Sequence, residues 1–139
     1  MNLPFSLRNP NEIKIINLCS RKPVKQILVV DDNAMNRKTL SLILQSIYPF
    51  TIYEARNVRT AQDIILQNNI ELIFCDYRMP MTSGLEFAEW LATQQYTGNF
   101  VLLTGSIEEL ETSHVHAILF KPLRKQILEE YLKYENLLE

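Results

Sequence analysis

The sequence predicts a doubly wound α/β fold, in which helices cover both faces of a parallel sheet. Three observations lead to this prediction. The 139 residues suffice for one domain, 47% of them are hydrophobic, and short apolar runs alternate with segments of helical periodicity. Strands that alternate with helices form right-handed βαβ crossovers and so build a parallel sheet. Five such units predict five strands in the order 2-1-3-4-5.

Five short, largely apolar runs are the expected strands, as is typical of strands covered on both faces. They comprise residues 27–30, 51–55, 72–75, 100–103 and 117–120. Between and after them, apolar residues recur at helical spacing and predict helices over residues 35–47, 58–65, 85–92 and 123–132. One more helix, the fourth in chain order, must fit within residues 106–115. This length allows only about two turns, so we expect the helix to be shortened.

The N-terminal residues 1–25 differ from this regular pattern because prolines interrupt them. The apolar stretch at residues 12–18 could form a short strand or one or two helical turns, and its periodicity does not decide between them. We expect an extension or linker over residues 1–25 and a single domain over residues 26–139. The extension could cover the sheet edge, contact a second copy of the chain or be disordered.

Composition excludes several classes of protein. The formal charge of -2 shows no basic excess for nucleic-acid binding. No apolar run approaches the ~20 residues of a membrane span, and the N-terminus lacks the pattern of a signal peptide. Cys19 and Cys75 lie in different contexts, and Cys75 ends an expected buried strand, so a disulfide framework is not expected. We therefore predict a cytoplasmic protein that binds neither nucleic acid nor membrane.

Five polar side chains lie where the expected strands end. They are Asp31 and Asp32 after the first strand, Asp76 after the third, Thr104 after the fourth and Lys121 after the fifth. In a sheet of this order, ligands bind beyond the carboxyl ends of the strands, so we expect these side chains to converge. Carboxylates held together raise each other's pKa, and a Mg²⁺ ion, which prefers hard oxygen ligands, relieves the repulsion.

This set of residues suits phosphoryl transfer to a carboxylate, which depends on positioning and charge stabilisation. Asp76 would be the nucleophile, and Asp31 and Asp32 would hold the metal directly or through water. Lys121 and the Thr104 hydroxyl would bind phosphoryl oxygens. Each feature alone has a structural explanation, because an Asp pair often caps a helix and a Lys-Pro pair often forms a turn. Their common position at one sheet edge favours a site.

The residues around these positions form a family pattern, which resembles the receiver domain of two-component response regulators over residues 25–139. The pattern consists of Val-Val-Asp-Asp-Asn at 29–33, Asp-Tyr-Arg-Met-Pro at 76–80, Gly84, Thr104 and Lys121-Pro122. The opening at residues 31–37 is especially similar to receivers fused to hybrid histidine kinases. The resemblance implies the flavodoxin-like receiver topology.

The resemblance also implies a function. Asp76 would be the phosphoacceptor, its donor would be a phosphohistidine on a histidine kinase or phosphotransfer protein, and Mg²⁺ or Mn²⁺ would be the cofactor. The Arg78 backbone carbonyl would be a further metal ligand, and the Lys121–Pro122 peptide would be cis. Such a domain catalyses only its own phosphorylation and dephosphorylation and is not otherwise an enzyme. It would present a phosphorylation-dependent surface to an unknown downstream partner or, alternatively, to a second copy of itself.

Two departures from the family pattern concern signalling. Receivers commonly carry Tyr or Phe three residues before the Lys, where this chain has Ile118, and Phe120 should point to the same face as Ile118. Gly105 replaces the usual Ala, and the fourth helix is expected to be short. We therefore expect the surface that receivers use for output to be remodelled.

Other functions remain as alternatives. A degenerate receiver would keep the fold and bind partners without phosphorylation. A phosphohydrolase of the same fold would need an Asp two residues after the nucleophile, where this chain has Arg78. A flavin-binding domain would need a phosphate-binding loop where Asp31 and Asp32 lie. His114 and His116 share a strand face and could bind a metal, but we expect a solvated pair.

Overall fold

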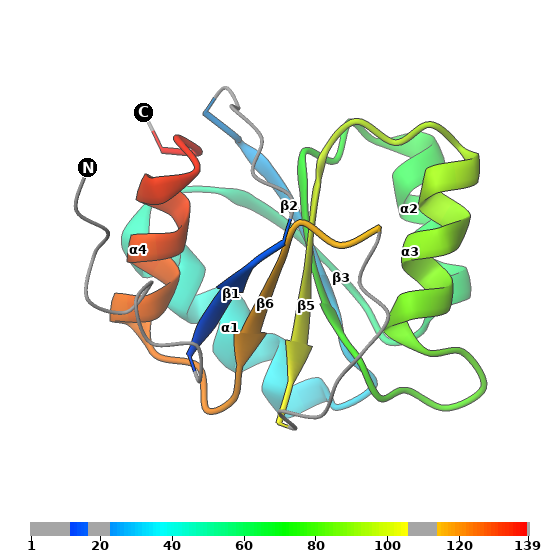
Figure 1. The fold of residues 1–139 in the computed structure, drawn as a ribbon, viewed down its shortest axis with the longest axis horizontal. Coiled ribbons are helices and arrows are strands. Elements are labelled where there is room, and N and C mark those ends of the chain that lie inside the picture. The colour runs from blue at the N-terminus through cyan, green and yellow to red at the C-terminus, as the bar shows by residue number, and fades with distance from the viewer. Residues whose placement is uncertain (1–11, 17–22, 106–113, 139) are drawn as a thin grey trace.

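The computed structural model describes residues 12–16, 23–105 and 114–138 of the chain. In these ranges the chain forms a sheet of six strands between two pairs of helices (Figure 1). On one side of the sheet lie α1 (Ala34–Ile47) and α4 (Lys125–Tyr134), and on the other lie α2 (Val58–Gln67) and α3 (Gly84–Thr93). Each pair covers its own hydrophobic core, so the sheet is buried on both faces.

The parallel part of the sheet has the predicted strand order. Its strands are β2 (Gln26–Val30), β3 (Thr51–Ala55), β4 (Leu72–Asp76), β5 (Asn99–Thr104) and β6 (Ala117–Phe120). They lie in the order β3-β2-β4-β5-β6, which is the predicted 2-1-3-4-5, and every neighbouring pair is parallel. All residues of β4 and β5 are buried, as expected for strands with helices on both faces.

The five predicted parallel strands are all present, and a sixth strand that was not predicted as such, β1 (Ile13–Ile15), extends the sheet by pairing antiparallel with β6. The main-chain N–H of Phe120 donates to the Glu12 carbonyl at 3.0 Å, and that of Ile16 donates to the His116 carbonyl at 2.9 Å. Ile13 is only 2% exposed and joins the core beneath α4. Part of the N-terminal extension therefore covers the β6 edge, which was one of the alternatives that the sequence left open.

Three helices begin with side-chain caps that fix the preceding loops. Asn33 caps α1 by accepting from the Asn36 N–H, Asn57 caps α2, and Ser83 caps α3. The helix periodicity was right in all four helices, but Met35 is 76% exposed in the first turn of α1 and does not join the core. The short helix predicted within residues 106–115 cannot be compared with the structure, because residues 106–113 lie outside the described residues.

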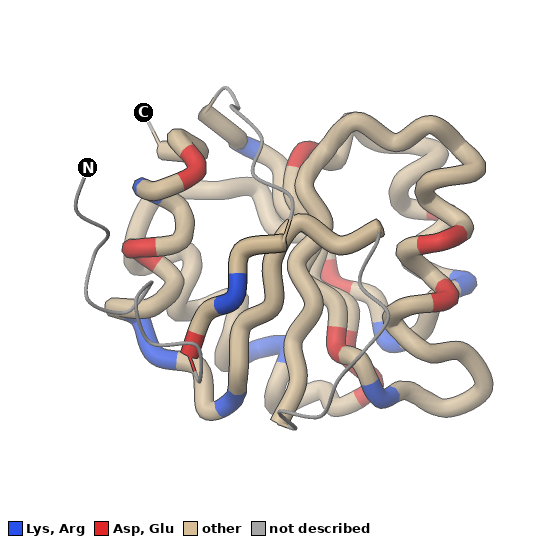
Figure 2. Tube along the Cα trace, in the orientation of Figure 1, with Lys and Arg blue, Asp and Glu red and all other residues tan. Residues whose placement is uncertain are grey.

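Charge and hydropathy agree with the composition. Acidic and basic residues are interspersed along the described trace (Figure 2). None of the helices in the described ranges combines the length and the apolar character that a membrane span requires.

Candidate functional site

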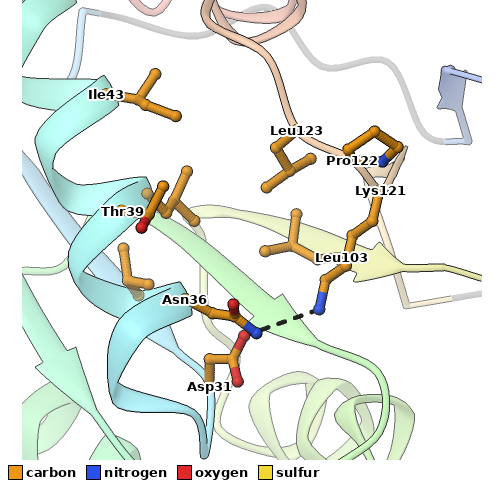
Figure 3. Close-up of a pocket in the computed structure, with 10 residues that line it drawn as sticks. Asp31, Asn36, Thr39, Ile43, Leu103, Lys121, Pro122 and Leu123 are labelled. Carbon is orange, nitrogen blue, oxygen red and sulfur yellow. Dashed lines mark ion pairs between the residues drawn. The ribbon is translucent and has the colours of Figure 1, made fainter.

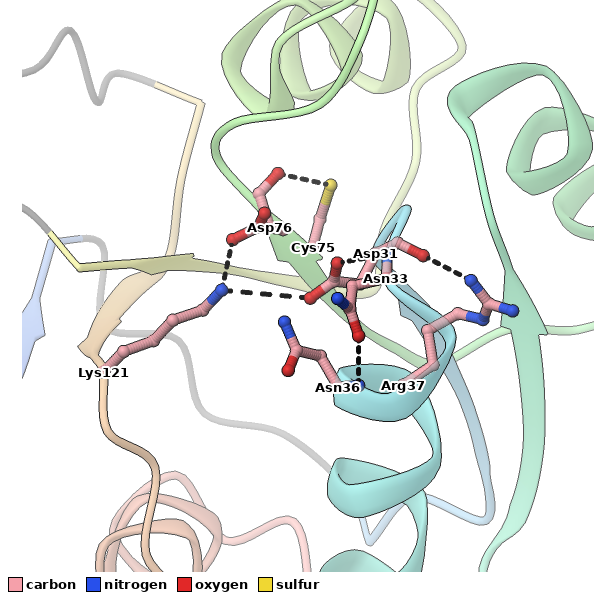
Figure 4. Close-up of polar contacts among 7 residues, drawn as sticks. All are labelled: Asp31, Asn33, Asn36, Arg37, Cys75, Asp76 and Lys121. Carbon is pink, nitrogen blue, oxygen red and sulfur yellow. Dashed lines mark hydrogen bonds and ion pairs between the residues drawn. The ribbon is translucent and has the colours of Figure 1, made fainter.

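Polar residues from the ends of three strands meet at one edge of the sheet (Figure 4). Asp31 follows β2, Asp76 ends β4 and Thr104 ends β5, and their exposed fractions are 3%, 8% and 3%. Lys121 follows β6, and its Nζ lies 2.8 Å from Asp76 Oδ1 and 3.8 Å from Asp31 Oδ2. The predicted convergence is therefore found for Asp31, Asp76 and Lys121, since parallel strands present their carboxyl ends at the same edge.

Asp31, Asp32 and Asp76 form an acidic cluster. Each offers a carboxylate oxygen, and these oxygens all lie within 4.8 Å of one another. Burial raises the pKa of Asp31 above its ordinary value, and the charges of Asp76 and Asp32 raise it further. The Asn33 N–H, which donates to Asp31 Oδ1 at 2.9 Å, and the Lys121 ammonium act in the opposite direction. The neutral form of Asp31 is favoured relative to a solvated Asp, so the ionised cluster needs cations.

The donor set of the cluster fits a divalent cation. When ionised, its three carboxylates face a single ammonium, that of Lys121, among the contacts of the described residues. The remaining negative charge, the hard oxygen donors and the exposed position of Asp32 suit Mg²⁺ or Mn²⁺, which bind few protein ligands and retain waters.

Asp31 is held in place by the backbone and by α1. Its main-chain N–H donates to the Ala55 carbonyl at 3.1 Å, which ties the end of β2 to the end of β3. Its main-chain carbonyl accepts from Arg37 Nη1 at 2.8 Å (Figure 4). Arg37 was not among the predicted site residues. The signal that could have found it is its place in the Asp-Asp-Asn opening of the family pattern, six residues after Asp31.

The loop after Asp76 requires a glycine at its end. The Gly84 N–H donates to the Tyr77 carbonyl at 2.9 Å, which folds the loop back onto the end of β4. A Cβ at Gly84 would lie 2.7 Å from the Asp76 carbonyl oxygen and 2.8 Å from Leu102 Cδ1. Because Gly84 has no Cβ, α3 can begin in direct contact with the main chain of Asp76.

Residues 27–133 match the family of the response regulator receiver domain. The chain belongs to this family. The match covers β2 to α4, and thus the whole acidic cluster and Lys121.

Curated relatives of this receiver come from bacteria and eukaryotes. The phosphate regulon transcriptional regulatory protein PhoB of Pseudomonas aeruginosa is 33% identical over 87 residues, which are 61% of this chain and 38% of that protein. The hybrid signal transduction histidine kinase F of Dictyostelium discoideum is 28% identical over 126 residues, which are 80% of this chain and 11% of that protein. The chain thus spans only a minor part of the length of these relatives.

Solved structures show the same fold. The chemotaxis protein CheY4 of Vibrio cholerae aligns with a TM-score of 0.73 and 22% identity, over 80% of this chain and 98% of that chain. A second structure holds a receiver domain of Saccharomyces cerevisiae in complex with a histidine phosphotransfer signaling protein. It aligns with a TM-score of 0.69 and 22% identity, over 82% of this chain and 90% of that chain.

One detail that the resemblance to receivers implied is present at Lys121. The Lys121–Pro122 peptide is cis, as predicted. The Lys121 N–H donates to the Thr104 carbonyl at 2.8 Å, which places the two residues side by side at the ends of β5 and β6. The Arg78 side chain is exposed, and its guanidinium carbon lies 5.9 Å from the centre of the Tyr77 ring.

Departures from the family pattern affect β6 and the residues before it. Ile118 is buried in the core beneath α2 and α3, and Phe120 packs against the same core, so the predicted common face is confirmed.

The prediction that His114 and His116 are both solvated was wrong for His116. His116 is half-buried, and its Nδ1 accepts from the Phe100 N–H at 3.0 Å, whereas His114 is exposed. The neutral ring then carries its proton on Nε2, which disfavours metal binding by this pair.

A pocket of ≈230 Å³ opens beside the acidic cluster, between α1 and the loop from β6 to α4 (Figure 3). Asp31, Asn36 and Lys121 line its polar end. The rest is largely apolar and is formed by Val29, Thr39, Leu40, Ile43, Leu103, Pro122 and Leu123. Leu123, which was predicted to lie in the last helix, precedes α4 and completes this wall.

Proposed function

We propose that this receiver is the phosphoacceptor of a two-component or phosphorelay pathway, and that Asp76 takes the phosphoryl group from a phosphohistidine. One observation carries this proposal. The Asp76 carboxylate lies at the end of a fully buried strand, beside the Lys121 ammonium at 2.8 Å and within the acidic cluster.

The proposed step is an in-line displacement. An Asp76 carboxylate oxygen attacks phosphorus, an O–P bond forms, and the P–N bond of the phosphohistidine breaks with its electron pair returning to the imidazole. Lys121 would stabilise the negative charge of the transferred phosphoryl group, since its ammonium already contacts Asp76 and faces Asp31. Thr104, at the adjoining strand end, would donate its hydroxyl to a phosphoryl oxygen.

The acidic cluster would hold the cofactor. Asp31, Asp32, Asp76 and the Arg78 backbone carbonyl would be the ligands. A bound Mg²⁺ or Mn²⁺ would neutralise charge on the phosphoryl oxygens. Asp31 contributes a carboxylate already oriented by the Asn33 N–H, so little reorganisation is needed on binding.

The receiver would catalyse only its own phosphorylation and dephosphorylation and would not turn over other substrates. The position two residues after Asp76, where phosphohydrolases of this fold carry an acid/base Asp, is the exposed Arg78. Hydrolysis of the phospho-aspartate would therefore rely on water without a dedicated side-chain base at that position. This supports a switch whose phosphorylated state persists long enough to be recognised.

The donor would be a histidine kinase or a phosphotransfer protein. The apolar pocket between α1 and Pro122 opens next to the acceptor, and Met35 adds exposed apolar surface on the first turn of α1. Both features suit an apolar side chain near a phosphohistidine that docks over Asp76. A downstream protein partner, a homodimer and a cytoplasmic location stay predictions of the sequence.

The test is intact-mass detection of phosphorylation. The protein is incubated with a small acyl-phosphate donor, with Mg²⁺ or with chelator, beside Asp76→Asn and the control Asp63→Asn, which alters an exposed Asp on α2. We expect one phosphoryl adduct that requires Mg²⁺, survives in the control and is absent from Asp76→Asn. No adduct with this donor or with histidine-kinase donors would instead support the degenerate receiver.

A further inference from the structure

Arg37 lies on α1 with a side chain that is only 17% exposed and points toward the end of β2. Its Nη1 donates to the Asp31 main-chain carbonyl at 2.8 Å (Figure 4). Its Nε lies 3.4 Å from Glu54 Oε1 on β3, which is an ion pair although not an aligned hydrogen bond. Arg37 therefore connects the metal-binding segment after β2 to the neighbouring strand.

Glu54 is itself anchored to α1 by a second contact. The hydroxyl of the buried Ser41 donates to Glu54 Oε2 at 3.2 Å. Ser41 lies four residues after Arg37, so the two side chains share one face of the helix. The Glu54 carboxylate thus spans two consecutive turns of α1, and this arrangement limits the positions that the Arg37 guanidinium can take.

The carbonyl that Arg37 contacts belongs to the peptide that joins Asp31 to Asp32. Its orientation determines where the Asp32 side chain starts relative to the Asp31 carboxylate. The Ala55 carbonyl accepts from the Asp31 main-chain N–H, and the Asn33 N–H and the Lys121 ammonium contact the Asp31 carboxylate, so none of these contacts holds the carbonyl. The contact from Arg37 is the one side-chain contact to this peptide among the hydrogen bonds of the described residues.

We infer that Arg37, held by Glu54, is a positioning residue that keeps the Asp31–Asp32 segment in the shape that binds the divalent cation. The inference rests on the proposed metal site. The charge of Arg37 allows a positioning role to be distinguished from a charge effect, because a guanidinium near the cluster repels a cation. Electrostatics alone predicts that removing Arg37 tightens cation binding, whereas a positioning role predicts that binding weakens.

The experiment measures cation affinity in the full, unphosphorylated chain. Mn²⁺ binding is followed by the electron paramagnetic resonance signal of free Mn²⁺, and Mg²⁺ affinity is obtained by competition. The variants are Arg37→Lys, Arg37→Met and Glu54→Gln. The control is Lys38→Met, which removes the same charge from an exposed neighbouring position on α1. Thermal unfolding in chelator identifies variants that fail to fold.

We expect both Arg37 variants to bind Mn²⁺ and Mg²⁺ about tenfold more weakly, as is typical when a residue that orients a metal ligand is lost. Lys at this position keeps the charge but cannot reach Asp31 and Glu54 together. Glu54→Gln should weaken binding in the same direction, and Lys38→Met should leave it unchanged or slightly tighter.

Three outcomes would overturn the inference. The first is wild-type affinity in a folded Arg37→Lys, and the second is tighter binding in Arg37→Met, which would leave only a charge effect. The third is a wild-type chain that binds neither cation, which would refute the proposed metal site as well. Because cation binding is measured without phosphorylation, failure of the inference and failure of the phosphoacceptor proposal are told apart.

Discussion

Replacing Gly84 by Ala should destabilise the domain and slow the phosphorylation of Asp76. An added Cβ would lie 2.7 Å from the Asp76 carbonyl oxygen, 2.8 Å from Leu102 Cδ1 and 3.2 Å from Tyr77 Cα. Two of these atoms belong to the backbone at the end of β4, so they cannot rotate away. The start of α3 must therefore move, or the Asp76 main chain must shift.

The magnitude follows from two opposed effects. Inserting one carbon into a packed site costs about 1–3 kcal/mol, and backbone neighbours place this case toward the upper end. Ala in place of Gly in a helix returns at most about 1 kcal/mol, and less at the first position. The net loss should be about 2 kcal/mol, which lowers the melting temperature by roughly 4–8 °C.

Urea unfolding in chelator measures this loss. Gly105→Ala is the matched control, because no atom lies within 4 Å of a Cβ at that position. We expect the control to match the wild type within about 0.5 kcal/mol. Equal stability of Gly84→Ala and the wild type would refute the argument that a glycine is required by the close approach of α3 to β4.

Three further substitutions test the site and the edge strand. Lys121→Met should slow adduct formation from an acyl phosphate about a hundredfold, because the ammonium beside Asp76 is lost; an intact-mass time course measures the rate. Asp31→Asn should raise the free energy of unfolding at pH 7 in chelator, because burial raises the pKa of Asp31 and so disfavours its ionised form in the fold. This gain should shrink as the pH falls toward the ordinary Asp pKa of 3.8 and vanish below it, because the carboxyl is then protonated in both states. Ile13→Asp should release β1, so that hydrogen exchange at the Phe120 amide accelerates while β4 stays protected.

Each of these substitutions has a control elsewhere in the described chain. Lys133→Met removes an exposed ammonium far along α4, Asp63→Asn an exposed carboxylate on α2, and Lys14→Ala alters the exposed residue of β1. A phosphorylation rate in Lys121→Met equal to that of the Lys133 control would contradict the assigned role. So would a stability gain in Asp31→Asn that does not depend on pH, or an unchanged Phe120 amide in Ile13→Asp.

The sequence was sufficient for the parallel sheet because burial on both faces leaves an unambiguous pattern. Residues 72–75 are apolar without interruption, and such a run between two amphipathic helices has few other interpretations. Counting the units then gave the strand order, and the strand order gave the convergence of Asp31, Asp76 and Lys121. The cis peptide at Lys121 came from the resemblance to receivers and not from the residues themselves.

What the sequence did not predict depends on contacts between distant residues. β1 has three residues, too few to show a period of two, and its existence depends on the open edge of β6. Likewise, nothing in the spacing of Arg37 and Glu54 announces an ion pair, because their proximity results from how α1 packs over β3. The pairing of an edge strand and an ion pair between distant residues are set by tertiary packing, so the spacing of residues along the chain does not predict them.

The features that make the acidic cluster unfavourable in the empty fold are those that suit it to the proposed switch. Burying Asp31 and Asp76 together raises the free energy of the unliganded domain, and Lys121 relieves this only in part because its side chain is still 31% exposed. A cation would interact with carboxylates that solvent screens poorly, so it would bind more strongly than at the surface. A protein selected for stability alone would replace one of these carboxylates. Their presence at the ends of two buried strands is therefore an argument for binding, and it leads to the same conclusion as the family match.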